Sequence, residues 1–163
     1  MIWLHQRRPA AFPLVRTTLV IASGLALVGY LAYPTAPPRF MPEWGFSDSV
    51  AQFTGLTSQN SSADALYNPF AAIPSMHVAF ALMLGVPMAV MSRRWIAKVA
   101  WSVYPALVTF VVVATANHWW FDAFTGALVA AVAAVAALLF ARWRPAAWAW
   151  PQPAVAGASH ASL

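Results

Sequence analysis

The stretch WIAKVAWSVYPALVTFVVVATANHWWFDAFTGALVAAVAAVAALLFARW, residues 95 to 143, decides the fold of this chain. It is almost continuously apolar, and as a single helix it would reach far beyond the ~30 Å of hydrocarbon in a bilayer. The chain must therefore turn once within it. The polar interruption Thr115-Ala116-Asn117-His118 predicts one crossing helix near Ile96 to Ala114 and another near Trp119 to Arg142.

Two more apolar runs precede this stretch. Thr17 to Tyr33 carries no charge and is long enough to cross a bilayer, and Pro74 to Met91 opens on a proline that suits a helix start. A cleaved signal peptide is an alternative interpretation of the first run, because basic residues precede it, but the proline-rich segment that follows makes a poor cleavage site. We therefore predict an all-α, multi-pass membrane helical bundle with about four transmembrane helices.

The composition agrees with a membrane location. Of the 163 residues, 61% are hydrophobic and 8% are charged, a balance too apolar for a soluble domain to keep its surface wet. The chain has no cysteine, which excludes disulfides, thiolate metal sites and a cysteine nucleophile. The net charge is +5, but the basic residues lie scattered at the ends of apolar runs, which argues against nucleic-acid binding.

The charges also orient the predicted helices. All basic residues except Arg39 fall on one side of a four-helix arrangement: Arg7, Arg8, Arg16, Arg93, Arg94, Lys98, Arg142 and Arg144. An excess of Arg and Lys marks the cytoplasmic side, so the opposite face is predicted to be periplasmic or extracellular. We expect residues 1–144 to form one membrane-embedded domain and residues 145–163 to form a disordered cytoplasmic tail.

Residues 34 to 70 form the one extended polar stretch and contain five prolines, which predicts a long external loop. Within this loop Phe46, Val50 and Phe53 recur at helical spacing. They predict a short helix that lies in the membrane interface.

The predicted outer side carries two histidines, an aspartate and an arginine. His77 lies at the start of the second helix together with Ser75, where free backbone N–H groups favour a phosphate. His118 and Asp122 are four residues apart, so we expect them on one helical face, with the carboxylate holding one imidazole nitrogen. Arg39 is expected to contact phosphate oxygens with its planar guanidinium.

These residues also allow other interpretations. Two histidines and an aspartate suit zinc, but Arg39 beside them would oppose a dication and matches an oxyanion, so we predict neither a metal nor a cofactor. His5 and His160 lie on the opposite side or in the tail and cannot join the group. A non-catalytic membrane module or a small transporter is the alternative from another functional class.

Three segments resemble the type 2 phosphatidic acid phosphatase (PAP2) superfamily, and within it the branch that includes inositol phosphorylceramide synthase-like proteins. They are YPTAPPR at residues 33–39, NPFAAIPSMH at residues 68–77 and NHWWFD at residues 117–122. The pairing of Pro-Ser-x-His with a later His-x-x-x-Asp is specific. The resemblance implies that His118 is the nucleophile and forms a phosphohistidine, that Asp122 orients it, that His77 protonates the leaving oxygen and that Arg39 clamps the phosphoryl group.

The chain departs from this family in two respects. The third motif often has an arginine six residues before its histidine, where this chain has Val112. We therefore expect phosphate binding to rest on Arg39, the helix-end amides beside Ser75, and Asn117. The family usually has six crossings whereas this sequence shows four, as if the first two were absent. We expect either a fragment of a longer protein or a homo-oligomer that completes the bundle.

The sequence thus predicts a metal-independent lipid phosphate phosphatase. It would hydrolyse a lipid phosphomonoester or diphosphate through a phosphohistidine at the outer membrane face. The alternative is a phosphotransferase that moves a phosphoryl or inositol-phosphate headgroup between lipids, because the two activities share their first half-reaction. Aromatic residues at Trp119, Trp120 and Phe121 favour a substrate whose tail stays in the bilayer, so the expected partners are a lipid phosphate and membrane lipids.

Overall fold

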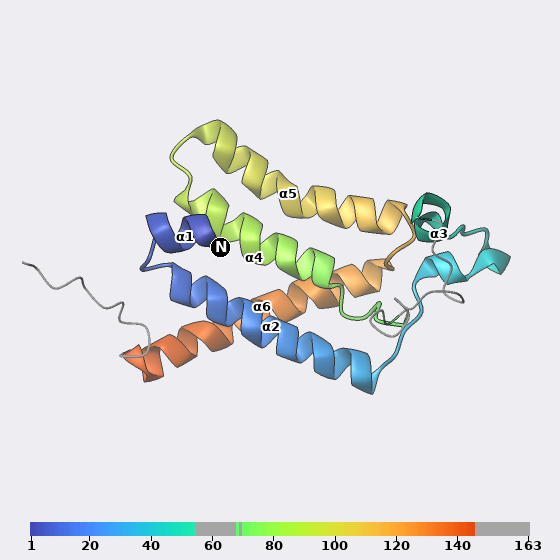
Figure 1. Cartoon of the computed structure of the whole chain (residues 1–163), viewed down its shortest axis with the longest axis horizontal. Coiled ribbons are helices and arrows are strands. Elements are labelled where there is room, and N and C mark those ends of the chain that lie inside the picture. The colour runs from blue at the N-terminus through green and yellow to red at the C-terminus, as the bar shows by residue number, and fades with distance from the viewer. Residues whose placement is uncertain (55–67, 69, 146–163) are drawn as a thin grey trace, which may run out of the picture.

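The computed structural model describes residues 1–54, 68 and 70–145, and these residues are helical apart from loops and one isolated bridge. Four long helices form a bundle: α2 (Phe12–Ala32), α4 (Met76–Met91), α5 (Trp95–Ala114) and α6 (Trp120–Trp143). Shorter elements are α1 (Ile2–Arg7), α3 (Ser49–Thr54) and the 3-10 turns η1 (Pro38–Phe40) and η2 (Pro42–Trp44). Figure 1 shows α3 at one end of the bundle and α1 near the other.

The prediction of a multi-pass membrane bundle is confirmed. Helices α2, α5 and α6 are long and apolar enough to cross a bilayer, and α4 is a shorter apolar helix. The buried core is made of small side chains such as Ala22, Ala79 and Ala133, whereas large ones such as Leu31 and Phe110 are exposed. This distribution suits lipid, which covers large apolar side chains while small ones let helix backbones approach each other.

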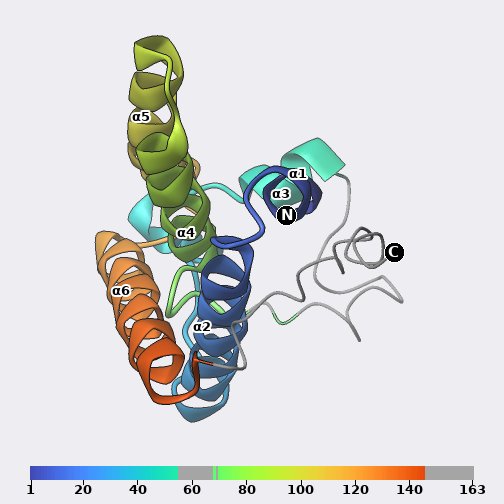
Figure 2. The ribbon, with the colours of Figure 1, turned by 90° about the vertical axis from the view of Figure 1, so that its left-hand side faces the viewer.

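Helix α4 lies at the centre of the bundle and packs against α2, α5 and α6. Helix α2 also packs against α6. Figure 2 shows α5 on the far side of α4 from α2. The basic residues predicted to share one side lie in α1, at the start of α2, around the turn between α4 and α5, and at the end of α6, opposite the end that carries α3 (Figure 1).

Several helix ends differ from the prediction. Helix α2 begins at Phe12 rather than Thr17, because Pro13 fits the first turn, where its missing N–H costs nothing. Helix α4 begins at Met76 rather than Pro74, since Ser75 is its N-cap. Helix α6 begins at Trp120, and Trp119 is its N-cap.

The loop between α2 and α4 contains the short helix α3, which begins after Phe46, the first residue of the predicted hydrophobic spacing. The Asp48 carboxylate accepts hydrogen bonds from the N–H groups of Val50 and Ala51 at 3.1 and 3.0 Å, so the helix begins after it. Phe46 therefore lies outside the helix, where its ring contacts Trp119. The predicted tail lies outside the described residues, apart from Pro145.

Two glycines allow the start of α4 to pack closely against α2 and α6. A Cβ on Gly29 of α2 would lie 2.9 Å from Cδ of Pro74, and a Cβ on Gly126 of α6 would lie 3.0 Å from the carbonyl carbon of Ser75 and nearer still to its oxygen. Glycine alone leaves this room for the neighbouring segment. The Tyr30 hydroxyl also donates to the Pro74 carbonyl at 3.0 Å. The position of the first turn of α4 is thereby fixed against α2 and α6.

Candidate active site

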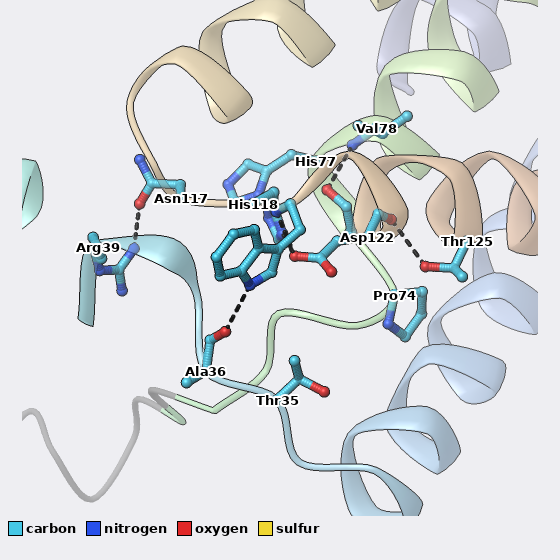
Figure 3. Close-up of polar contacts among 12 residues, drawn as sticks. Thr35, Ala36, Arg39, Pro74, His77, Val78, Asn117, His118, Asp122 and Thr125 are labelled. Carbon is cyan, nitrogen blue, oxygen red and sulfur yellow. Dashed lines mark hydrogen bonds and ion pairs between the residues drawn. The ribbon is translucent and has the colours of Figure 1, made fainter. Parts of the chain in front are cut away.

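Asp122 is fully buried in the first turn of α6 and lies against His118 (Figure 3). Its Oδ2 atom is 3.3 Å from Nδ1 of His118 and accepts a hydrogen bond from the Trp119 N–H at 2.8 Å. His118 precedes the helix, so this contact does not come from two positions on one helical face, as the spacing had suggested. It arises because a carboxylate in the first helical turn reaches back to the residues before the helix.

His77 lies in the first turn of α4 and contacts His118. Its Nδ1 atom is 3.2 Å from Nε2 of His118, and the two rings meet edge to face. The Ser75 N–H donates to the Asp122 carbonyl at 3.0 Å, which joins the starts of α4 and α6 and brings the two imidazoles together. His118 is only 6% exposed, whereas His77 is exposed, so His77 has the greater freedom to move.

The order of these contacts defines a proton arrangement. If both imidazoles are neutral, each contact carries a proton when Nδ1 of His118 donates to Asp122 and Nδ1 of His77 donates to Nε2 of His118. In this tautomer Nε2 of His118 bears a lone pair directed towards the exposed His77. A buried carboxylate behind an imidazole can hold that tautomer and stabilise positive charge on the ring.

Arg39 is buried at the same end of the bundle, with 7% of its surface exposed. Its guanidinium donates to Oδ1 of Asn117, and its Nε atom lies 3.6 Å from Oδ1 of Asp48 (Figure 3 shows the Asn117 contact). Its backbone N–H donates to the Ala116 carbonyl at 2.9 Å. Arg39 is therefore attached directly to the turn that carries His118.

The turn between α5 and α6 is shaped by its own backbone. The Val112 carbonyl accepts hydrogen bonds from the N–H groups of both Asn117 and His118 at 3.0 Å. Ala116 has a φ of 55°, in the left-handed region that few non-glycine residues adopt. The Ser49 hydroxyl donates to the Thr115 carbonyl at 2.9 Å, so the first residue of α3 is hydrogen-bonded to the same turn.

A second backbone connection joins the segment after α2 to the segment before α4. The Thr35 N–H donates to the Phe70 carbonyl at 2.7 Å, and the Ala72 N–H donates to the Thr35 carbonyl at 3.1 Å. The segment that leads to Arg39 is thus paired with the segment that leads to His77. Three parts of the sequence that are far apart meet at one end of the bundle.

Ser75 and Asn117, the other two predicted phosphate-binding residues, also lie here, but both are engaged within the protein. The fully buried Ser75 hydroxyl accepts from the Val78 N–H at 3.5 Å and caps α4. The Asn117 side chain accepts from Arg39 and donates to the Thr115 hydroxyl at 2.7 Å. Direct contact with phosphate would require an exchange of these bonds, so that role stays a prediction.

Sequence reasoning did not anticipate the contacts of Trp119 and Asp48. The Trp119 indole N–H donates to the Ala36 carbonyl at 3.1 Å, and its ring packs edge to face against Trp44. Asp48 lies near the guanidinium of Arg39 while it caps α3. The sequence predicted only that the aromatic residues from Trp119 on favour a lipid tail. Hydrophobic spacing does not reveal partners so far along the chain for Trp119 or Asp48.

The position where the related family often has an arginine is apolar in structure as well as in sequence. Val112 is buried in a cluster with Val78 and Ala123. Arg39 supplies positive charge at this end from the loop between α2 and α4 instead. Among the described residues, no group of three or more His, Asp or Glu side chains is arranged to hold a metal ion.

Comparison with known proteins gives one match. A family model described as PAP2 superfamily matches residues 1–136, a range that includes every residue of the candidate site. No curated protein and no solved structure matches the chain significantly.

Proposed function

The chain belongs to the PAP2 superfamily, and from this membership we propose that it is a metal-independent lipid phosphate phosphatase. Membership itself supports a phosphatase-type activity. The observation that carries the finer proposal is the series of contacts from Asp122 Oδ2 to His118 Nδ1 and from His118 Nε2 to His77 Nδ1. A nucleophile, an orienting carboxylate and a proton donor are in mutual reach there.

In the first half-reaction His118 attacks the phosphorus of the substrate. The bond from Nε2 to phosphorus forms while the bond from phosphorus to the leaving oxygen breaks. His77, protonated on both ring nitrogens when the substrate is bound, gives that oxygen a proton and becomes neutral. The imidazoles touch in the resting structure, so the exposed His77 must move aside for the phosphoryl group to enter between them. Asp122 remains ionised and stabilises the positive charge that develops on His118.

In the second half-reaction water attacks the phosphohistidine. His77, now without its proton, takes one from the water, the bond between phosphorus and nitrogen breaks, and inorganic phosphate leaves. The starting tautomer of His118 is restored, so no external acid, base or co-reactant is consumed.

The charges around the site support phosphate rather than another ligand. Helices α4 and α6 both begin here, so the positive ends of two helix dipoles and their free N–H groups point to one place. Arg39 adds a planar cation that can contact two phosphate oxygens once a substrate replaces Asn117. Such preorganised groups stabilise the charge on the transferring phosphoryl group.

We also propose that this end of the bundle faces the outside of the cell. The basic residues gather at the opposite end, which the positive-inside rule makes cytoplasmic (Figure 1). The exposed residue Glu43 lies at the end that carries the site, and the exposed residue Arg93 lies at the basic end, so labelling at these two positions tests the orientation. In intact cells an impermeant thiol reagent should label Glu43→Cys but not Arg93→Cys, and the opposite labelling would overturn the orientation.

Release of inorganic phosphate by purified protein tests the activity. We expect release from phosphatidic acid or a polyprenyl diphosphate, lost in His118→Ala and kept in the control His5→Ala, which changes a histidine of α1. Inositol and lipid alcohols are added in parallel, because transfer to them in place of phosphate release would identify the transferase alternative. Binding of lipid phosphates without release or transfer would refute an enzymatic function.

A further inference from the structure

An apolar groove of about 710 Å³ runs along the bundle between α4, α5 and α6. Its outer end is formed by Val78 and Ala123, each directly after a residue of the candidate site, His77 and Asp122. Its inner end reaches Val90 of α4. One end of the groove is therefore next in sequence to the proposed site of phosphoryl transfer, and the groove leads from there into the depth of the membrane.

The dimensions of the groove fit a hydrocarbon chain. From Val78 to Val90 along α4 the rise is roughly 18 Å, close to one leaflet of a bilayer whose hydrocarbon is ~30 Å thick. The groove thus has the length and volume to hold one extended hydrocarbon chain along α4.

The walls of the groove are mostly apolar. Among the described residues that line it, Ser102 and Thr109 carry hydroxyls, and both bond within α5: Ser102 donates to the Lys98 carbonyl at 2.9 Å and Thr109 to the Pro105 carbonyl at 2.8 Å. The other described lining residues are aliphatic or aromatic, and Trp101 and Trp120 add indole N–H groups. Such a surface favours hydrocarbon and gives few specific hydrogen bonds.

We propose that this groove holds a hydrocarbon tail of the substrate while the phosphate lies between His77 and His118. The inference rests on the proposed phosphatase function and adds the place and depth at which the lipid is bound. Because the groove is lined by the residues that directly follow His77 and Asp122, a tail held there keeps the phosphate near the nucleophile, and binding energy from the tail is used for catalysis. A tailless phosphate ester lacks this contribution.

The variant Ala106→Phe tests the proposal, because Ala106 lines the groove and is exposed, so a larger side chain fills the groove without disturbing the core. We expect kcat/KM for dioleoyl phosphatidic acid to fall about tenfold, while kcat/KM for para-nitrophenyl phosphate changes less than about twofold. The matched control is Ala100→Phe, on the same helix but outside the groove. It should leave both values unchanged.

An equal loss for both substrates in Ala106→Phe, or no loss for phosphatidic acid, would overturn the proposal. So would a change of oligomeric state without dependence on the tail, which would make the groove an interface between copies of the chain.

Binding is measured separately with a phosphatidic acid that carries a diazirine in its tail. We expect photolabel on the groove side of α5, removed by excess unmodified phosphatidic acid and not by the matching phosphatidylcholine. Label that both lipids remove equally would show bulk lipid in the groove and overturn the proposal. The photolabelling measures binding and does not depend on turnover. A protein that shows no phosphatase activity would therefore contradict the proposed function, while the labelling would still show whether the groove binds the tail.

Discussion

Replacement of Asp122 by asparagine tests whether the buried carboxylate sets the reactive form of His118. In the structure Oδ2 serves both His118 and the Trp119 N–H, whereas Oδ1 is buried and has no hydrogen-bond partner among the described residues. An amide keeps one oxygen and places an NH2 group at the other position. If its oxygen stays on Trp119, the NH2 group is buried without an acceptor at a cost of about 1–3 kcal/mol.

If the amide turns instead, its NH2 group faces Nδ1 of His118. That arrangement favours the tautomer with the proton on Nε2, which removes the attacking lone pair. Either arrangement also removes the negative charge opposite the phosphohistidine. We therefore expect kcat/KM to fall by about two orders of magnitude or more, which corresponds to about 2.7 kcal/mol or more of lost transition-state stabilisation.

The assay is the initial rate of phosphate release by purified Asp122→Asn, with the melting temperature measured on the same sample. The melting temperature should fall by only several degrees, because the loss of stability is limited to about 1–3 kcal/mol. Glu43→Gln is the matched control, since Glu43 is an exposed carboxylate at the same end of the bundle and should tolerate the change. An Asp122→Asn protein with more than about a tenth of the original kcat/KM would refute the reasoning.

Three further predictions follow from the same structure. Gly126→Ala should lower stability by about 1–3 kcal/mol in thermal unfolding, because its Cβ would overlap the Ser75 carbonyl; Gly24→Ala, whose Cβ would meet nothing within 4 Å, should not lower it. Arg39→Lys should lower kcat/KM about tenfold or more, because an ammonium that replaces the guanidinium cannot contact two phosphate oxygens as a planar fork does; activity equal to the unchanged protein would contradict this. A chelator should leave phosphate release unchanged while vanadate inhibits it, and activity abolished by chelator and restored by zinc would contradict a metal-independent site.

The helical fold could be predicted because hydropathy alone decides whether a segment enters the membrane. The apolar run from 95 to 143 must turn, and its polar interruption locates that turn between α5 and α6. The predicted positions of the helix ends were less accurate, because a helix end depends on individual capping residues. Ser75 and Trp119 act as N-caps where the hydrophobic pattern had already begun a helix.

The residue types of the candidate site could be proposed from sequence, but their geometry could not. The contact of His77 with His118 depends on how closely the start of α4 approaches α6, which Gly126 permits through the absence of a side chain. Hydrophobic periodicity does not record such an approach. The ion pair of Arg39 with Asp48 depends likewise on the path of the chain from residue 39 to residue 48 rather than on any spacing in the sequence.

The central claim is that His118 becomes covalently phosphorylated, and rapid quenching of the protein with phosphate-labelled lipid tests it most directly. The proposed mechanism predicts label on the protein that is stable in alkali, is lost in acid and is absent from His118→Ala. His5→Ala, which changes a histidine of α1, should retain it. Label that persists in His118→Ala, or full turnover by the unchanged protein with no labelled intermediate under conditions that slow water attack, would contradict the mechanism.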